Sequence, residues 1–461
     1  MNDYMNFNRV LIANRGEIAL RAIRVCQNLG MKTVAVYSTA DAASPHVWAA
    51  EESICIGPPP AQESYLSIPT LLHIAIEMQC DAVYPGYGFL AENAAFARQC
   101  EENGIKFIGP SAETINIMGD KSKARETAVK YGVPVVPGSD QAYTFLEQAQ
   151  KAAVDIGYPI LIKARSGGGG RGMRIVEEEA GFASAFAQAT REAEAAFNDG
   201  AVYMERFFST VRHIEVQVFG DGKGGSLEFD ERECSVQRRH QKLVEESPSP
   251  VVSDEMRKCL LEAAGKLTRG ICYEGAGTVE FIFDVESEEF YFIEMNTRIQ
   301  VEHTVTEMRI GIDLVEAQFY IAQGKPFPNF DKSKIPGGHA IEFRINAEKW
   351  KLDFQPSPGT LNIWQVPQAE GIRVDTATYQ GQQISPFYDS MIAKLIVHGR
   401  DRSEALRKAR GALSGFGCEG IATTIDFHRM LVNHEDFIAN RVHTRWIETE
   451  MCAEDRGTSP S

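Results

Sequence analysis

Short apolar runs alternate with helical stripes over residues 9–110, and this alternation restricts the possible folds more than any other feature of the sequence. Four of the runs are typical of buried parallel strands, at residues 9–13, 32–37, 81–84 and 105–108. The helix expected after the first run ends near Gly30, where a left-handed residue is favoured. This order of elements predicts an open parallel α/β domain.

The turn after the first expected strand argues against a dinucleotide site. It reads Asn14-Arg-Gly-Glu17 and holds one glycine, Gly16, where the dinucleotide fingerprint has three. The turn either belongs to a different kind of binding site or is simply a tight turn at Gly16 that binds no ligand.

The pattern changes after a stretch rich in proline and glycine, GVPVVPGSD at residues 132–140, which is typical of a linker or hinge. Residues 212–218 and 278–283 alternate at period two, so an antiparallel sheet is expected there. A strand at about residues 391–397 and a helix with one apolar face at Ala405, Leu406, Ala409, Ala412 and Leu413 indicate a mixed C-terminal region. The final EDRGTSPS is expected to be disordered.

Composition excludes several classes of function. The 461 residues carry a formal net charge of -16, which disfavours binding to nucleic acid. Nine cysteines show neither metal-binding nor disulfide spacing. Because the sequence shows no secretory leader and no apolar run long enough to span a bilayer, we expect a cytoplasmic protein that binds no membrane.

Residues 166–173, SGGGGRGM, place four glycines in a row behind an apolar run, YPILIKA. The lysine of that run, Lys163, precedes the glycines, whereas a P-loop has its lysine after them. We therefore expect a flexible hairpin loop whose bare N–H groups close over phosphate oxygens, with Lys163 adding charge beneath them. A surface loop without a ligand is the alternative.

Two glutamates are expected to face each other in TVEFIFDVESEEFYFIEMN, residues 278–296. If this segment is a hairpin that turns near Ser287, Glu280 lies opposite Glu294, and Asn296 shares their face. Opposed carboxylates repel each other, and Mg²⁺ or Mn²⁺ would neutralise them, since such cations prefer oxygen ligands. Two solvated glutamates are the alternative.

The alternation continues beyond the hairpin through Arg298, Gln300 and Glu302. Arg298 offers a planar fork for a small oxyanion such as bicarbonate, and Glu302 would be its general base. The basic run QRRHQK at residues 237–242, followed by two glutamates, belongs either to this site or to a charged surface turn.

These residues resemble the biotin carboxylase members of the ATP-grasp superfamily. Ten motifs occur in the family's order, namely IANRGEIA, YPGYGFLAEN, FIGPS, MGDK, KARSGGGGRGM, RHIEVQV, ERECSVQRRHQKLVEE, EMNTRIQVEHTVTE, FRINAE and FYDSMIAKLI. The resemblance implies an N-terminal pre-ATP-grasp domain (1–115), an ATP-grasp domain (116–330) with a mobile glycine-loop lid at about 138–208, a mixed C-terminal domain (331–448) and a disordered tail (449–461). Tyr84 and Thr424 depart from residues common in the family.

The resemblance also implies the roles of particular residues. ATP would contact Lys121, Lys163, Gly168, Gly169, Gly170, Glu205, Arg206, Phe207, Phe208, His213, Gln237 and His240, and Mg²⁺ or Mn²⁺ would bind Glu280, Glu294 and Asn296. Lys242, Arg298, Gln300 and Val301 would surround bicarbonate, and Glu302 would remove its proton. Arg344 would stabilise the enolate of biotin.

The implied reaction is the ATP-dependent carboxylation of biotin by bicarbonate through carboxyphosphate. The sequence holds no AMKM-like biotin-attachment tetrapeptide, so the resemblance implies a free-standing homodimeric subunit that acts on biotin on a separate carrier protein, beside a carboxyltransferase subunit. The final acceptor stays open among acetyl-CoA, propionyl-CoA, another acyl-CoA, pyruvate and urea. The alternatives are another ATP-grasp ligase, which would have no reason to carry QRRHQK with RIQVEH, and an inactive nucleotide-binding subunit, which would not need Arg298 and Glu302.

Overall fold

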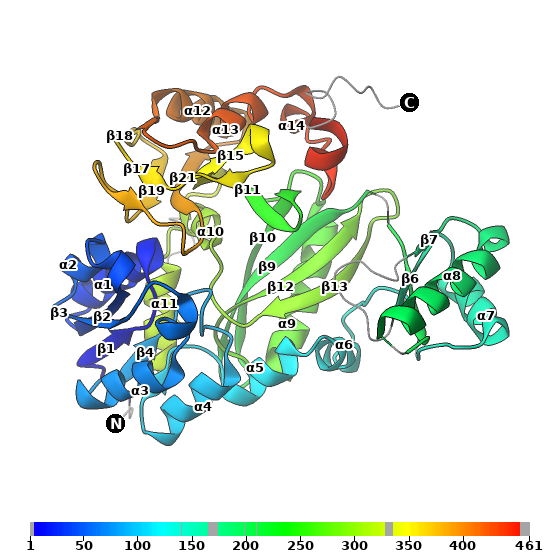
Figure 1. Cartoon of the computed structure of the whole chain (residues 1–461), viewed down its shortest axis with the longest axis horizontal. Coiled ribbons are helices and arrows are strands. Elements are labelled where there is room, and N and C mark those ends of the chain that lie inside the picture. Colours follow the sequence, from blue (N-terminus) through cyan, green and yellow to red (C-terminus); the bar gives the residue numbers. More distant parts are fainter. Residues whose placement is uncertain are drawn as a thin grey trace.

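The computed structural model describes residues 4–139, 141–164, 174–197, 199–208, 210–327 and 335–451. The eight-stranded sheet lies in the middle of the molecule, between the N-terminal sheet on one side and a small domain with a three-stranded sheet on the other (Figure 1). The predicted glycine loop at residues 166–173 and the last ten residues lie outside the described part of the chain.

The N-terminal sheet is parallel, as predicted, with the order β3-β2-β1-β4-β5. Its strands are β1 (Arg9–Ile12), β2 (Lys32–Ser38), β3 (Glu52–Gly57), β4 (Ala82–Tyr84) and β5 (Lys106–Phe107), and the helices among them are α1 (Gly16–Asn28), α2 (Pro45–Ala49), α3 (Ile68–Glu77) and α4 (Ala94–Glu102). Gly30 has the expected left-handed conformation, with φ of 73°. The sequence did not reveal β3, because this edge strand has a single buried residue, Ile56, and therefore no buried apolar run.

The central sheet has eight antiparallel strands in the order β13-β12-β9-β10-β11-β14-β21-β19. They are β9 (Arg212–Asp221), β10 (Ser226–Arg238), β11 (Gln241–Ser247), β12 (Glu274–Asp284), β13 (Glu289–Asn296), β14 (His339–Asn346), β19 (Ile372–Thr376) and β21 (Met391–Gly399). Helices α5 (Ala112–Gly119), α6 (Lys121–Lys130), α9 (Asp254–Gly270), α10 (His303–Ile310) and α11 (Leu314–Ala322) belong to the same part. The sheet continues across the boundary predicted at residue 330, so both sides of that boundary share one layer.

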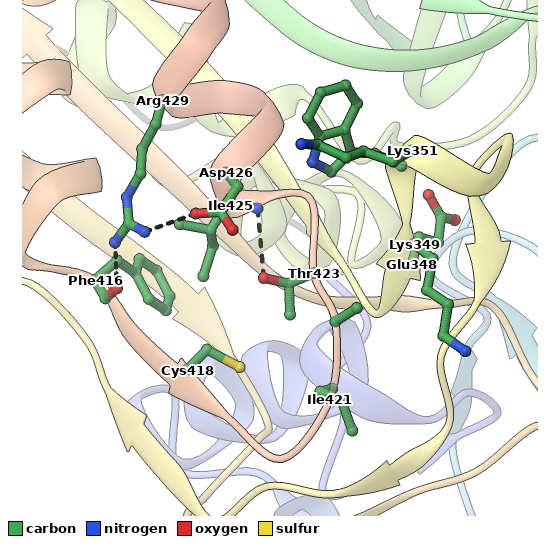
Figure 2. Close-up of a pocket in the computed structure, with 12 residues that line it drawn as sticks. Glu348, Lys349, Lys351, Phe416, Cys418, Ile421, Thr423, Ile425, Asp426 and Arg429 are labelled. Carbon is green, nitrogen blue, oxygen red and sulfur yellow. Dashed lines mark hydrogen bonds and ion pairs between the residues drawn. The ribbon is translucent and has the colours of Figure 1, made fainter.

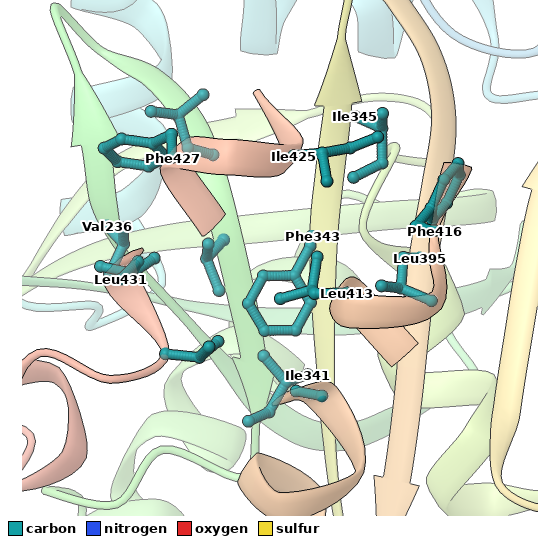
Figure 3. Close-up of a cluster of buried hydrophobic side chains, with 14 of the residues drawn as sticks. Val236, Ile341, Phe343, Ile345, Leu395, Leu413, Phe416, Ile425, Phe427 and Leu431 are labelled. Carbon is teal, nitrogen blue, oxygen red and sulfur yellow. The ribbon is translucent and has the colours of Figure 1, made fainter. Parts of the chain in front are cut away.

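The C-terminal region packs its helices on the far end of this sheet (Figure 1). Helices α12 (Arg402–Gly415), α13 (Ile425–Leu431) and α14 (Glu435–Ile438) accompany three short strand pairs, β15 (Glu348–Lys349) with β16 (Gln355–Pro356), β17 (Gly359–Thr360) with β20 (Gln383–Ile384), and β18 (Ile363–Gln365) with β22 (Gly417–Glu419). Phe343, Leu395 and Leu413 meet in its core (Figure 3). The predicted tail begins too early, because residues 449–451 belong to the helical turn Ile447–Met451, which buries both of its end residues.

The small projecting domain carries the strands on either side of the predicted lid loop. Strands β6 (Ile160–Ala164), β7 (Arg174–Val176) and β8 (Val202–Arg206) form an antiparallel sheet in the order β7-β6-β8, covered by α7 (Leu146–Ile156) and α8 (Glu179–Phe197). The segment predicted as a linker is held at both ends: the Pro134 carbonyl accepts from the Phe292 N–H at 2.7 Å, and the Ser139 N–H donates to the Met204 carbonyl at 2.8 Å. This segment therefore connects β13 to the small domain through backbone hydrogen bonds.

Candidate active site

Three glutamates form a row across three neighbouring strands of the central sheet. Glu280 on β12 is paired with Glu294 on β13, as the sequence predicted, and on its other side with Glu215 on β9. Asn296 lies on the same face, where its side-chain amide donates to Glu280 at 2.9 Å. The predicted pair of opposed carboxylates is confirmed, and Glu215 is an addition to it.

Lys242 neutralises the buried end of this row. Its Nζ lies 2.6 Å from Glu215, 2.9 Å from Glu280, 2.7 Å from Glu302 and 3.0 Å from the Gln300 side-chain oxygen. Burial alone would raise the pKa of Glu280, but Lys242 and the nearby His213, whose Nε2 is 2.9 Å away, outweigh it and hold that pKa well below its ordinary value. Glu280 is therefore a fixed anion at neutral pH.

The outer member of the row, Glu294, has a different environment. Among the described residues, its carboxylate forms no hydrogen bond or ion pair, and it is partly exposed. Burial and the facing charge of Glu280 raise its pKa, and Lys121 at the start of α6 opposes that rise. Two opposed carboxylates, one of them without a partner, provide the oxygen donors that a hard divalent cation requires.

The chain beyond Asn296 is not a strand, so the predicted continuation of a period-two face is wrong in its secondary structure. Residues 297–302 form a turn that leads into α10. The side chains nevertheless converge as predicted: Gln300 donates to Glu280 at 2.9 Å, and Arg298 donates to Asn296 at 2.9 Å and to Glu92 at 2.8 Å. Side-chain hydrogen bonds, rather than strand alternation, bring these groups together.

A second cation, Arg344 on β14, closes the site on the side of the C-terminal region. It donates to Glu302 at 3.0 Å and to Glu245 at 2.6 Å. Burial would raise the pKa of Glu302, but Lys242 and Arg344 together keep it far below its ordinary value. Burial raises the pKa of Glu245 to about 7, although Arg344 opposes that shift. Each oxygen of Glu302 thus faces a different cation.

Among the residues expected to contact a nucleotide, Lys163 lies on β6, and Glu205 to Phe208 lie on β8 or directly after it. Lys163 is bound to Glu205 at 2.6 Å, and the ring of Phe208 lies 5.4 Å from the ring of Tyr291 on β13. Arg206 lies over the Phe208 ring, and the Phe207 N–H donates to the Pro159 carbonyl at 2.8 Å. Gly168, Gly169 and Gly170 lie outside the described residues.

The basic run at residues 237–242 combines both predicted possibilities. Arg239 and His240 form an exposed left-handed turn between β10 and β11, with φ of 47° and 66°. Gln237 and Lys242 are paired neighbours on the two strands and lie inside, where Gln237 is 3.5 Å from His213. The turn itself is a charged surface feature, whereas the strand residues on either side of it belong to the site.

Three family models match this chain in succession. They are the biotin carboxylase N-terminal domain over residues 6–115, the ATP-binding domain of the carbamoyl-phosphate synthase L chain over residues 120–330, and the biotin carboxylase C-terminal domain over residues 342–449. Biotin carboxylase 1 of Bacillus subtilis (strain 168) is 48% identical over 441 residues, which cover 96% of this chain and 98% of that protein. The chain belongs to the biotin carboxylase family.

Solved structures of biotin carboxylases have the same fold. A biotin carboxylase complex from Campylobacter jejuni superimposes with a TM-score of 0.85 at 47% identity, covering 96% of this chain and 99% of that one. The bicarbonate-bound biotin carboxylase domain of a thermophilic 2-oxoglutarate carboxylase gives a TM-score of 0.91 at 42% identity, covering 99% of this chain and 100% of that one. Biotin carboxylases are ATP-dependent ligases that carboxylate biotin with bicarbonate.

Sequence reasoning missed three charged residues around this biotin carboxylase site: Glu92, Glu215 and Arg232. Glu215 stands two residues after His213 on a predicted strand, so the alternation used for Glu280 and Glu294 would have found it. Arg232 is fully buried and donates to Glu215 at 2.5 Å and to Gln217 at 2.7 Å. No local pattern marks Glu92, because its partner Arg298 is 206 positions away.

The two departures from the family pattern occupy well-defined places. The Tyr84 hydroxyl donates to Gln318 at 3.1 Å, and its ring stacks on Phe319 at 5.4 Å between centroids. The Thr424 hydroxyl donates to the Arg344 carbonyl at 2.9 Å and accepts from the Asn346 N–H at 2.9 Å. Thr424 thus supports the strand that carries Arg344, and Tyr84 packs between the N-terminal sheet and α11.

A separate cavity of about 320 Å³ opens in the C-terminal region, between residues 348–351 and the segment 416–429 (Figure 2). Cys418 and Ile421 line it, and Arg429 lies at its edge with bonds to Asp426 and to the Phe416 carbonyl. None of the predicted site residues lines this cavity.

Among the described helices, none is long and apolar enough to cross a membrane.

Proposed function

We propose that this biotin carboxylase uses the cluster around Lys242 and Glu302 to make carboxyphosphate from ATP and bicarbonate, and then carboxylates biotin carried on a separate protein. The observation that supports this most strongly is the Glu302 carboxylate held between two cations from different strands, Lys242 and Arg344. A small anion that binds between Lys242 and Arg344 would contact both cations and would also lie beside the Glu302 carboxylate.

Mg²⁺ or Mn²⁺ would bind at Glu280 and Glu294, where the opposed carboxylates provide oxygen donors. The metal would neutralise charge on the phosphates. Asn296 would join them after a rearrangement, because its amide now donates to Glu280 and its oxygen accepts from Arg298. Lys121 and Lys163 would bind the phosphates, and for Lys163 this requires release from Glu205.

Glu302 would act as the base that takes the proton of bicarbonate. Its low pKa makes it ionised but a weak base while both cations are bound to it. Bicarbonate is itself an anion and competes for Lys242 and Arg344, so its binding would raise the pKa of Glu302 towards the value that proton transfer requires. The oxygen freed in this way would attack the γ-phosphorus of ATP, giving carboxyphosphate and ADP.

Biotin would then react at the Arg344 end of the site. Decomposition of carboxyphosphate releases CO₂ and phosphate, and that phosphate would take the N1′ proton of biotin. Arg344 would stabilise the resulting enolate, and its partly buried guanidinium, paired with two carboxylates, supports this oxyanion role. Arg298, Gln300 and Val301 would complete the bicarbonate contacts.

Bicarbonate-dependent release of ADP, stimulated by free biotin, tests the proposal directly. Glu302→Gln keeps the shape of the side chain and one hydrogen-bonding oxygen but removes the base, so the rate is expected to fall by about 10²–10⁴-fold. Glu255→Gln, on the exposed first turn of α9, is the matched control and keeps the wild-type rate. An unchanged rate in Glu302→Gln means that another group is the base.

The proposed reaction also requires partners for this chain. We propose a separate biotin carrier, a carboxyltransferase subunit and a homodimer of this chain. Biotin carboxylase 1 of Bacillus subtilis, 98% of which this chain covers, supports the separate carrier, and the biotin carboxylase domain dimer of Hydrogenobacter thermophilus supports the homodimer. Biotin covalently attached to the purified protein, detected by mass spectrometry, would contradict a separate carrier. The cytoplasmic location stays a prediction, and so does the identity of the acyl-CoA or other acceptor.

A further inference from the structure

Three sequence motifs each supply one residue that the proposed chemistry does not use, and the fold brings these three residues together. IANRGEIA supplies Glu17 on α1, YPGYGFLAEN supplies Tyr87, and FYDSMIAKLI supplies Lys394 on β21. The Tyr87 hydroxyl donates to Glu17, and the Lys394 Nζ lies 3.1 Å from the same Glu17 oxygen. The three residues form a largely buried chain of contacts behind the bicarbonate end of the site.

The chain of contacts ends on the turn that carries Glu302. Lys394 donates to the backbone carbonyl of Val301 at 3.0 Å. The preceding carbonyl, that of Gln300, accepts from the His303 ring nitrogen at 2.8 Å. The main-chain hydrogen bonds of this turn are longer. The His303 N–H donates to the Gln300 carbonyl at 3.4 Å, and the Val305 N–H donates to the Glu302 carbonyl at 3.3 Å. Two buried side chains therefore hold this turn more closely than its own backbone does.

We propose that Lys394 is a positioning residue for bicarbonate, which acts by fixing the peptide between Val301 and Glu302. This inference rests on the proposed function of the site. In a trans peptide the carbonyl and the N–H point in opposite directions. With its oxygen bound to Lys394, this peptide directs the Glu302 N–H away from Lys394 and sets the direction in which the Glu302 side chain leaves the backbone.

The cost of burying Lys394 supports a specific role for it. Its side chain has 0% exposure, and a buried charge destabilises a fold unless it is paired. The charged groups around it come from three elements: Glu17 on α1, Glu342 on β14, and Asp375 and Arg373 on β19. Lys394 is also the paired neighbour of Arg344 across β14 and β21, so the two cations stand on adjacent strands.

Two variants separate positioning from stability. Lys394→Met fills the same space without the bond to Val301, but it leaves Glu17 without its counter-charge. The double variant Glu17→Gln with Lys394→Met removes both charges and so recovers stability without restoring that bond. Both are expected to raise the KM for bicarbonate about 10- to 100-fold while the KM for ATP stays within about twofold. The melting temperature falls in the single variant and rises again in the double variant.

Several results would overturn the proposal. One is a KM for bicarbonate within about twofold of wild type in either folded variant, and another is an equal rise in the KM for ATP, since neither is expected of a displaced bicarbonate turn. A failure of both variants to fold would show that Lys394 is a structural residue only. Wild-type protein without bicarbonate-dependent ADP release would instead contradict the proposed function, whatever the variants do.

Discussion

At the scale of single residues, the site separates its buried acids into two groups. Lys242 holds the pKa of Glu280 and Glu302 below the ordinary value, whereas burial raises the pKa of Glu245 to about 7 and of Glu342 to about 8. The two acids with lowered pKa both contact Lys242, whereas Glu245 is bound to Arg344 and Glu342 accepts from the Thr304 hydroxyl. Such opposite shifts in neighbouring groups are typical of sites that move protons.

Glu342 provides a test of this division through stability. Its folded pKa of about 8 lies above the unfolded value of 4.5, so the folded protein keeps a proton that the unfolded chain has released between those values, and stability falls as pH rises through this window. Glu342→Gln imitates the protonated form. We expect equal melting temperatures for variant and wild type near about pH 5, and a variant about 1–3 °C higher near about pH 9. A constant difference at both pH values in thermal unfolding would contradict the assignment.

At the scale of elements, the β12–β13 hairpin depends on a bulge that alternation cannot reveal. The pairing shifts between Glu280 and Phe281, so that Phe281 faces Phe292 while Glu280 still faces Glu294. Without the shift, Phe292 would share the face of the glutamates, because it has the same parity as Glu294. The bulge lets Phe292 join Phe281 in the core and leaves Ile293 exposed.

The facing pair predicts opposite effects of one substitution with and without metal. Glu294→Gln removes a like-charge contact directly across the hairpin, so the metal-free variant is expected to be about 0.2–1 kcal/mol more stable than wild type. Added Mn²⁺ stabilises wild type through binding to the folded state, and the variant loses most of that response. Thermal unfolding with and without Mn²⁺ measures both effects. A variant that keeps the full Mn²⁺ response would place the metal elsewhere.

At the scale of the whole molecule, the N-terminal, ATP-grasp and C-terminal regions all contribute residues to the site. Lys242 and Arg344 stand on β11 and β14, adjacent strands of the sheet that the ATP-grasp and C-terminal regions share. Glu92, from the N-terminal region, binds both the Arg298 side chain and the Thr297 N–H, each within 2.9 Å. The N-terminal region therefore orients the arginine expected to bind bicarbonate.

This contact predicts that a substitution in the N-terminal region changes bicarbonate use. Glu92→Gln keeps an acceptor for Thr297 but loses the charge that orients Arg298, so kcat/KM for bicarbonate is expected to fall about 3- to 10-fold with little change for ATP. Lys106→Met is a matched control, because its bond to Glu274 at 2.6 Å also links the N-terminal region to the central sheet. Equal effects of the two substitutions in steady-state kinetics would show that the contact merely joins the two regions.

The sequence by itself determined the periodic features of this protein. Buried runs gave four of the five parallel strands. A hairpin turn placed near Ser287 gave the pairing of Glu280 with Glu294, and period-two alternation gave their face, since both follow from chain geometry over a few residues. The ordered motifs gave the family, which the comparisons with known proteins confirm.

Only the tertiary structure decided which charges meet. Periodicity says which side of a strand a residue faces, but not which group from a distant segment will lie opposite. Lys242 therefore could not be predicted to contact Glu215, Glu280 and Glu302, nor Lys394 to hold the carbonyl of Val301. These contacts join residues 27 to 93 positions apart, and packing of the sheet against the turn before α10 places them within hydrogen-bonding distance.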